Sequence, residues 1–514
     1  MRLSEIESAL REHPGVRDAA VVFRESNPGE REVVGYIVPD AAYLESFLSG
    51  TEEEQKRLQK WRKTFDLMQF GKDANSSALA FNIAGWNSSY TRQPIPAEQM
   101  REWVDESVKE ILALRLSEIL EIGCGTGLLL LRIAPGCKRY VATDFSGAVL
   151  QRLKEQMAKL ERPLDGVSLF ERTADNFEGF APDSFDTVVI NSVIQHFPSV
   201  TYLVRVLERM LEVVRPGGKI FFGDVRSLSL LNAYAASVEL FQAPPAMNLA
   251  ELRERVLRRA NHQEQLVVSP AFFLALQRRF PKISRVEIRP RRGCFDNELN
   301  RFRFNATLSI GHETGELFEP AWQEWPAAGM TIEAIRRMLE KPGCTTLALR
   351  SVPNARIERD ISAANEIARD GGARTAADLR ASLQKTETRG VDPQALWNLA
   401  DDLGFFLDLS WASSREDGSF DLLFRRMPHG EPPPRFSVAW PVPASPGEDL
   451  LQHANTPGQR VLSSKLIQEL IDFSKQKFSP SAVPSAFVLM DAIPLQSNGE
   501  LNYEALPRPE ISQS

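Results

Sequence analysis

The sequence is poor in several features that would assign a function class directly. It has four cysteines in 514 residues, and none of them belongs to a CxxC pair. This scatter argues against a disulfide framework and against a cysteine-bound metal, so no metal site is expected. It also favours a reducing compartment, and we therefore expect a cytoplasmic protein. The cysteines are Cys124, Cys137, Cys294 and Cys344.

Positive charge and long apolar runs are scarce as well. The 68 acidic residues outnumber the 61 lysines and arginines, so the formal net charge is −7 and gives no support for a nucleic-acid partner. No apolar run approaches the roughly 20 residues that span a bilayer, so no membrane partner is expected. No secretory signal follows Met1. A chain of 514 residues is too long for one core, which predicts two or more domains.

The most informative stretch covers residues 116 to 144. An apolar strand ends near Glu121 and leads into a glycine turn, GCGTG, at residues 123–127; a second strand ends at Asp144. Glycines let the backbone bend sharply and approach a ligand. An acid 21 positions after Gly123 stands where ribose hydroxyls lie in a doubly wound sheet. The spacing is not the dinucleotide pattern G-x-G-x-x-G, and Glu121 would repel a pyrophosphate but attract a cationic aminoacyl end.

This stretch resembles motif I of the class I S-adenosylmethionine-dependent methyltransferases. The resemblance implies that Glu121 faces the methionine amino group of the cofactor, that the glycine turn supports the methionine part, and that Asp144 binds the ribose. The alternative is an ordinary strand–turn–helix without a ligand. Strands and helices alternate beyond Asp144, which predicts an α/β, Rossmann-like sheet of five parallel strands. An antiparallel edge is expected from residues 285–289 and 302–310.

The strand ends supply further candidate cofactor contacts, because ligands lie outside the carboxyl ends of parallel strands. Asp175 is expected at the adenine amino group, with Asn176 and Phe145 beside the ring, and Asn191 at the methionine end. A turn acid that caps the next segment is the alternative for Asp175. The predicted cofactor-binding residues are Trp86, Tyr90, Glu121, Gly123, Cys124, Gly125, Gly127, Asp144, Phe145, Asp175, Asn176 and Asn191.

Residues 81 to 96 have no clean periodicity and are rich in aromatic and hydrogen-bonding side chains. A loop over a pocket has this composition, so Trp86 and Tyr90 are expected to contact the cofactor. A linker held by two aromatic side chains is the alternative.

Four polar residues beyond the fourth and fifth strands are expected near the methyl acceptor. A sulfonium donor is already activated, so the protein mainly positions the reactants and excludes water. A free α-amine has a pKa of about 7.7 to 8.0, so polar groups that orient it can replace a strong base. The alternative for His196 is a packed or surface position. The alternative for Arg226 is an ion pair with a neighbouring acid. The predicted catalytic residues are Gln195, His196, Asp224 and Arg226.

The two ends of the chain resemble the halves of one small subdomain. Residues 3 to 16 and 483 to 507 are similar to the C-terminal subdomain of nonribosomal peptide synthetase adenylation domains. That family usually has lysine after the final Asn-Gly turn, whereas Glu500 follows Asn498-Gly499 here. An acid would repel a carboxylate and a phosphate. We therefore expect no adenylation by this chain, which also lacks the large ATP-binding core.

The rest of the chain resembles the N-methyltransferase domain that is inserted in such synthetases. The resemblance is carried by residues 85–90, 297–303 and 352–356, and it covers nearly the whole insertion. The expected domains are the first part of the adenylation subdomain at 1–40, a methyltransferase core with a helical entry segment at 41–310, an additional α/β methyltransferase lobe at 311–435, and the second part of the adenylation subdomain at 436–514.

The resemblance implies a function and its partners. We expect S-adenosylmethionine-dependent N-methylation of an aminoacyl thioester on the phosphopantetheine arm of a peptidyl carrier protein. The adenylation core and other synthetase domains are the further expected partners. Methyl transfer to oxygen or carbon stays open, because the cofactor half of the site would be the same. A catalytically inactive docking module is the second alternative.

Overall fold

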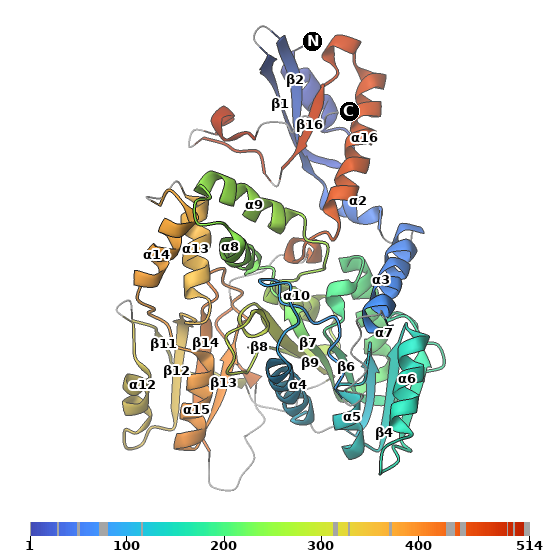
Figure 1. Cartoon of the computed structure of the whole chain (residues 1–514), viewed down its shortest axis with the longest axis vertical. Coiled ribbons are helices and arrows are strands. Elements are labelled where there is room, and N and C mark those ends of the chain that lie inside the picture. Colours follow the sequence, from blue (N-terminus) through green and yellow to red (C-terminus); the bar gives the residue numbers. More distant parts are fainter. Residues whose placement is uncertain are drawn as a thin grey trace. The chain divides into compact units, whose positions relative to one another are not determined.

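The structure is a computed structural model, and it divides into two compact units (Figure 1). The smaller unit comprises Met1–Lys56, His262–Glu264 and Thr456–Ser514, and the larger unit comprises Arg57–Asn261 and Gln265–Asn455. The structure describes residues 2–27, 30–48, 52–70, 81–114, 117–311, 317–326, 329–369, 373–427, 437–442, 449–490, 492–496 and 499–507.

A seven-stranded sheet organises the larger unit, with strand order β5-β4-β3-β6-β7-β9-β8. The first five strands in this order are parallel, and β9 pairs antiparallel with both β7 and β8. The predicted fold class, a class I methyltransferase sheet with an antiparallel edge, is therefore confirmed. The strands are β3 (Glu118–Ile122), β4 (Arg139–Asp144), β5 (Val167–Glu171), β6 (Phe185–Asn191), β7 (Val214–Arg226), β8 (Ile283–Pro290) and β9 (Arg303–Ile310).

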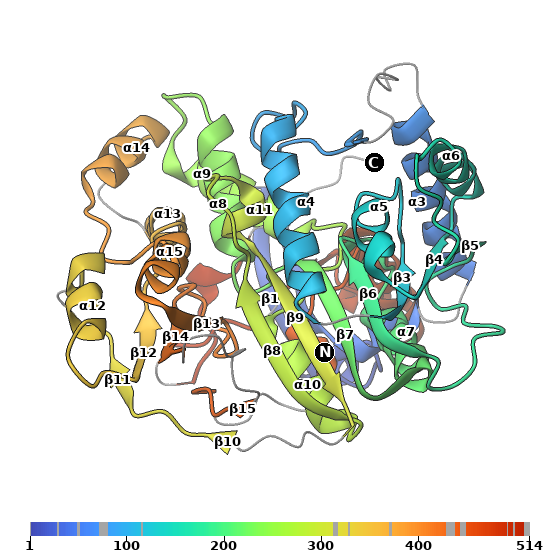
Figure 2. The same ribbon diagram turned by 90° about the horizontal axis from the view of Figure 1, so that it is seen from below.

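Helices cover both faces of this sheet (Figure 2). Successive side chains of a strand point to opposite faces, so Phe221 packs with Trp103 of α4 while Phe222 packs with Leu207 of α7. Helix α7 begins where the Ser199 hydroxyl accepts a hydrogen bond from a backbone N–H, and it buries a wide apolar stripe. The helices are α3 (Glu52–Phe70), α4 (Ala97–Leu112), α5 (Leu130–Ile133), α6 (Gly147–Met157), α7 (Val200–Val213), α8 (Leu231–Gln242), α9 (Leu249–Asn261), α10 (Pro270–Arg279) and α11 (Glu298–Arg301), with the short turns η1 (Ala134–Gly136) and η2 (Ile194–His196).

A second sheet in the same unit has the order β11-β12-β14-β13. One ion pair links it to the first sheet, because Asp408 of β13 accepts from Arg289 of β8 at 2.9 Å; within the second sheet, Asp408 also accepts from Arg425 of β14 at 2.9 Å. Its strands are β11 (Trp322–Glu324), β12 (Thr346–Val352), β13 (Phe405–Ser410) and β14 (Phe420–Arg426), beside the pair β10 (Leu317–Phe318) and β15 (Ser437–Val438). The helices of this region are α12 (Ile332–Leu339), α13 (Glu358–Ala368), α14 (Ala376–Lys385) and α15 (Pro393–Leu403), and the short turn η3 (Leu450–His453) packs against α10.

The smaller unit joins segments from both ends of the chain in one sheet, with the order β1-β2-β16. Leu10, Ile37 and Leu466 share its core. The predicted final turn lies partly outside the described residues, since Ser497 and Asn498 are not described; Gly499 has a φ of 84°. The elements are α1 (Leu3–Leu10), β1 (Val16–Asn27), β2 (Glu30–Pro39), α2 (Ala41–Ser46), α16 (Gln459–Lys477), η4 (Pro480–Ala482), β16 (Ala486–Leu489) and η5 (Tyr503–Ala505). A bilayer-crossing helix is not found in the described parts of the chain.

Candidate active site

The glycine turn between β3 and α5 is closely packed. Gly123 has a φ of 74°, and a Cβ there would lie 2.5 Å from Val193 Cγ2. A side chain at this position would therefore be strained and would clash. The Asp144 carboxylate fixes the turn, because it accepts hydrogen bonds from the Gly125 N–H at 2.9 Å and from the Ser146 N–H at 2.9 Å. The end of β4 thus sets the conformation of the turn.

A cavity of about 450 Å³ opens at the carboxyl ends of the parallel strands. Many of the predicted site residues line it: Trp86, Glu121, Gly123, Cys124, Gly125, Asp144, Phe145, Asn176, Asn191 and His196. The structure places the others outside the lining, namely Tyr90, Gly127, Asp175, Gln195, Asp224 and Arg226.

Two buried carboxyl groups face this cavity. Glu121 is 3% exposed and accepts a hydrogen bond from the Tyr140 hydroxyl at 2.8 Å. Burial raises the pKa of Glu121 to about 7 and that of Asp144 to about 6, although hydrogen bonds to both carboxylates act in the opposite direction. Both groups are uncharged more often at neutral pH than exposed acids would be. A bound cation would favour their charged forms, so this end of the cavity is suited to a cationic ligand.

Asp175 follows β5 but is engaged elsewhere. Its carboxylate accepts from the Tyr202 hydroxyl at 3.0 Å and lies 3.4 Å from the Arg205 guanidinium. Tyr202 lines the cavity, and so does the neighbouring Asn176. Asp175 is thus placed to orient Tyr202. Of the two neighbouring residues Asp175 and Asn176, it is Asn176 that lines the cavity.

The predicted loop at residues 85–90 is held by α8 and α11. The Glu298 carboxylate accepts from the Ser89 N–H at 2.9 Å and from the Ser89 hydroxyl at 3.0 Å. The Tyr90 hydroxyl lies 2.8 Å from Ser237 Oγ of α8, which directs Tyr90 away from the cavity. Trp86, by contrast, lines the cavity and packs 4.6 Å from the Trp103 ring, between centroids.

Helix α3 supplies a wall that the sequence analysis did not assign to the site. Leu58, Trp61 and Phe65 line the cavity. Trp61 stacks on His196 with 3.6 Å between centroids and an interplanar angle of 10°, and Phe65 lies 5.8 Å from Phe145. The signal was an apolar stripe at positions i, i+3 and i+7 of an otherwise charged helix.

The environment of His196 determines what it can do. Burial, together with the positive charges of Arg226 and Arg303, lowers the pKa of His196 to about 3. The imidazole is therefore neutral at physiological pH and is a very weak base. It can still form a hydrogen bond with a ligand.

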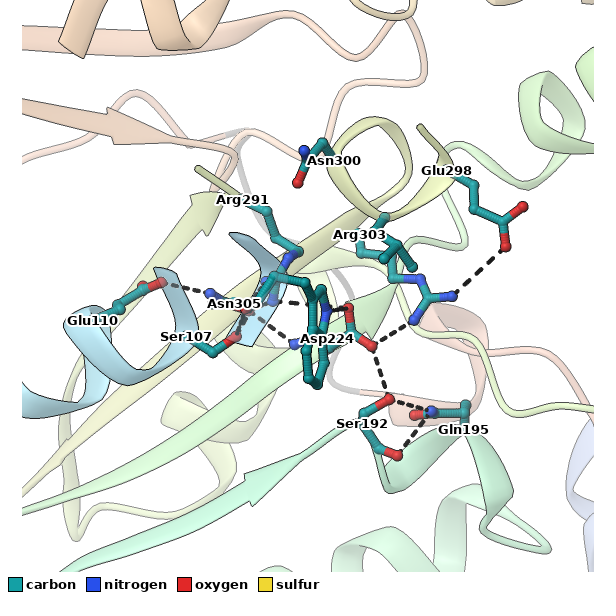
Figure 3. A network of polar contacts seen from close by, with 12 residues as sticks. Ser107, Glu110, Ser192, Gln195, Asp224, Arg291, Glu298, Asn300, Arg303 and Asn305 are labelled. Atoms are coloured by element: carbon teal, nitrogen blue, oxygen red, sulfur yellow. Dashed lines mark hydrogen bonds and ion pairs between the residues drawn. The ribbon is translucent and has the colours of Figure 1, made fainter. Parts of the chain in front are cut away.

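Asp224 is the centre of a buried polar network (Figure 3). Its carboxylate accepts from Trp103 Nε1 at 2.9 Å, from Ser192 Oγ at 2.8 Å and from Arg303. Burial alone would raise the pKa of Asp224, but Arg303 and Arg291 hold it below its usual value. Its hydrogen-bonding capacity is used within the protein, so we assign Asp224 the task of positioning Ser192 and Trp103, which both line the cavity.

Gln195 belongs to the same network. Its Nε2 donates to the Ser192 carbonyl and to Ser192 Oγ, both at 2.9 Å (Figure 3). Asn191 lines the cavity, and its Oδ1 is buried without a hydrogen-bond partner in the described structure. A Cβ on Gly223 would lie only 1.9 Å from this oxygen, so the amide of Asn191 needs glycine on the neighbouring strand.

Comparison with known proteins gives two family matches. Residues 120–220 match the methyltransferase domain family, and residues 5–72 match the C-terminal domain of AMP-binding enzymes. The first match covers the glycine turn and the strands that frame the cavity, and the second begins in α1 of the smaller unit.

Curated relatives match over almost the whole chain. Chondramide synthase cmdD of Chondromyces crocatus is 37% identical over 100% of this chain and 13% of its own length. Cyclosporin synthetase simA of Tolypocladium inflatum is 29% identical over 98% of this chain and 3% of its own length. The chain therefore spans only a small part of the relatives that it matches. The predicted arrangement, a methyltransferase insert in the C-terminal subdomain of an adenylation domain, is confirmed.

Solved structures match at low identity. N-methyltransferase NodS of Bradyrhizobium japonicum WM9 is 19% identical, with a TM-score of 0.27, over 40% of this chain and 96% of its own. Its complex with S-adenosyl-L-homocysteine is 16% identical, with a TM-score of 0.25, over 44% of this chain and 100% of its own.

Proposed function

We propose that this chain methylates the α-amine of an aminoacyl thioester while the substrate is held on the phosphopantetheine arm of a peptidyl carrier protein. A methyltransferase in a nonribosomal peptide synthetase context is what the comparisons support. The observation that carries the proposal is the cavity at the carboxyl edge of the parallel sheet, with Glu121 and Asp144 buried in its wall. The adenylation core and other synthetase domains are the further proposed partners, and the cytoplasm the proposed compartment.

S-adenosylmethionine is the cofactor, and the residues present fit it. Glu121 can accept from a cationic amino group, the glycine turn leaves room for close approach, and Asp144 can accept from ribose hydroxyls. The apolar side chains of Phe65 and Phe145 can cover an aromatic ring. When bound, the cofactor supplies a methyl group on an activated sulfonium; the protein's residues bind, orient and exclude water.

Binding of the cofactor is expected to depend on pH. Only the charged form of Glu121 attracts a cation, and its pKa of about 7 means that affinity should increase as the pH rises. Between pH 6 and pH 7.5 the dissociation constant should fall by roughly eight-fold if binding requires one ionised group of this pKa. Calorimetry in buffers of different ionisation enthalpy should show proton release on binding.

The matched control is Glu121→Gln, which keeps the shape of the side chain but cannot ionise. Its affinity should be weaker at pH 7.5 and should change by no more than about two-fold between pH 6 and pH 7.5, the change that ionisation of Asp144 with a pKa of about 6 allows. An equally steep pH dependence in this variant would exclude Glu121 as the titrating group.

The acceptor side of the site favours nitrogen over oxygen or carbon. His196 is too weak a base to take up a proton at neutral pH, and Asp224 is occupied by internal donors. A hydroxyl or carbon acceptor would need a base that removes its proton. An α-amine with a pKa of about 7.7 to 8.0 already has a neutral fraction, so orientation is enough.

A pair of assays on one preparation tests the proposal. A carrier protein preloaded with an amino acid should gain the mass of one methyl group after incubation with the chain and S-adenosylmethionine. Amino-acid-dependent pyrophosphate exchange should remain at background, because this chain has Glu500 in place of the usual lysine. No mass gain while the cofactor binds would support the inactive docking module instead.

A further inference from the structure

The charged side chains of the cavity gather on the side that we assign to the cofactor. Of the described residues that line the cavity, five have a charged side chain: Arg62, Glu121, Asp144, Glu171 and Arg172. The three acids lie in β3, β4 and β5, which are neighbours at one edge of the seven-stranded sheet, and Arg172 follows directly after β5. Arg62 of α3 is paired with Glu171 at 2.6 Å. The charges of the cavity are therefore confined to its cofactor side.

The side of the cavity beyond the end of β6 is lined by large apolar side chains, which we call the uncharged wall. They come from α3, from α4, from the loop at residues 85–90 and from the residues that follow β6. The members of the uncharged wall are Leu58, Trp61, Trp86, Trp103, Val193 and Phe197. The Trp61 ring stacks on His196 with 3.6 Å between centroids, and the low pKa of His196 keeps this neighbour uncharged as well.

Polar groups beside the uncharged wall are engaged within the protein. Ser192 Oγ donates to the Asp224 carboxylate at 2.8 Å (Figure 3), and Trp103 Nε1 donates to the same carboxylate at 2.9 Å. The Asn82 amide donates to Gln69 Oε1 at 3.0 Å. Asp224 itself is not among the lining residues. A charged group that entered this side would thus meet no counter-charge on the described part of the wall.

The structure of the substrate brings its side chain to this wall. In an aminoacyl thioester, the α-amine and the side chain are both bonded to the Cα atom. The amine must reach the methyl group of the bound cofactor for an in-line displacement, so the side chain enters the cavity together with the amine. Because the charged side is taken by the cofactor, the uncharged wall remains for the side chain of the amino acid.

We propose that this chain methylates aminoacyl groups with apolar side chains, and that the uncharged wall excludes acidic and basic ones. This inference rests on the proposed function and names its substrate class. An apolar side chain that packs against the wall is removed from water, which favours binding. The side chain of an aspartyl or lysyl group would lose its hydration there without gaining a counter-charge.

Three substrates of nearly the same shape separate charge from size. They are the leucyl, asparaginyl and aspartyl thioesters of pantetheine. Relative to the leucyl substrate, kcat/KM should be about 10-fold lower for the asparaginyl substrate and at least about 100-fold lower for the aspartyl substrate, because an unpaired carboxylate is the most costly group to bury. Equal values of kcat/KM for the leucyl and aspartyl substrates would overturn the proposal.

A charge placed in the wall should change the preference. The native chain should favour a norleucyl over a lysyl thioester by at least about 100-fold, and Leu58→Asp should reduce this ratio by about 10-fold or more, because its carboxylate attracts the lysyl ammonium. Leu67→Asp is the matched control, since Leu67 lies on the same helix, is 72% exposed and is outside the described cavity lining. Its ratio should stay within about 2-fold of the native value.

Equal changes in the two variants, or an unchanged ratio in Leu58→Asp, would contradict the role of the wall. If Leu58→Asp does not fold, the three substrates of similar shape still decide the proposal on the native chain.

Binding measurements separate this inference from the proposed function. Calorimetry with the native chain, S-adenosyl-L-homocysteine and the amide analogues of the leucyl and aspartyl substrates should show at least about 100-fold weaker binding of the aspartyl analogue. If the native chain binds the cofactor but methylates no substrate, the proposed function fails, and the ratio of the two affinities still decides which side chains the cavity accepts. Equal affinities, or no measurable binding of the leucyl analogue, would refute the inference.

Discussion

Asp144→Ala should weaken the binding of S-adenosylmethionine by about 100-fold, which corresponds to ~2.7 kcal/mol. The carboxylate is 3% exposed and holds the glycine turn through the N–H groups of Gly125 and Ser146. Its removal takes away two charge-assisted hydrogen bonds that shape the turn, together with the acceptor proposed for the ribose. Calorimetry on the folded variant measures the change.

Asp175→Ala is the matched control, because this residue also follows a strand of the parallel sheet. Its carboxylate contacts Tyr202 and Arg205 instead of lining the cavity. The affinity for the cofactor should therefore change by less than about 3-fold, in the range of a surface ion pair. Equal losses in the two variants would mean that both acids contact the cofactor, as the sequence alone predicted.

Asp224→Ala should lower the free energy of unfolding of the larger unit by about 3 to 5 kcal/mol. Arg303 would lose the nearer of its two counter-charges, Arg291 would lose a carboxylate 3.7 Å away, and Trp103 Nε1 would lose its acceptor. All of these groups are buried. Denaturant unfolding followed by tryptophan fluorescence reports this unit specifically, because all 8 tryptophans lie between residues 57 and 455.

Asp402→Ala provides the comparison. Asp402 pairs with Arg336 at 3.1 Å, but its side chain is 62% exposed, so its removal should cost less than about 1 kcal/mol. A similar small cost for Asp224→Ala would show that the network in Figure 3 does not stabilise the unit in the way described.

The strands and the glycine turn could be predicted because their signals are local. The turn at 123–127, the acid at Asp144 and the apolar strands follow from short patterns, and the antiparallel edge at β8 and β9 was predicted within a few residues. Helix α8 was missed because it is buried on most sides and rich in alanine, so its sequence lacks a clear polar face.

The details of the site depend on contacts between distant residues. Asp175 is directed by Tyr202 and Arg205 of α7. The pKa of His196 is lowered by burial and by the charges of Arg226 on β7 and Arg303 on β9. No local pattern encodes such contacts. The position of each residue along its strand therefore predicted that the site residues gather at the carboxyl edge of the parallel sheet. It did not predict which of these residues line the cavity.

The most direct test of the central claim is the position of the transferred methyl group. A carrier protein loaded with an amino acid is incubated with this chain and with S-adenosylmethionine that carries a deuterated methyl, and the aminoacyl group is then analysed by tandem mass spectrometry. The account predicts one labelled methyl on the α-nitrogen. A labelled methyl on oxygen or carbon, or an unlabelled aminoacyl group despite bound cofactor, would contradict it.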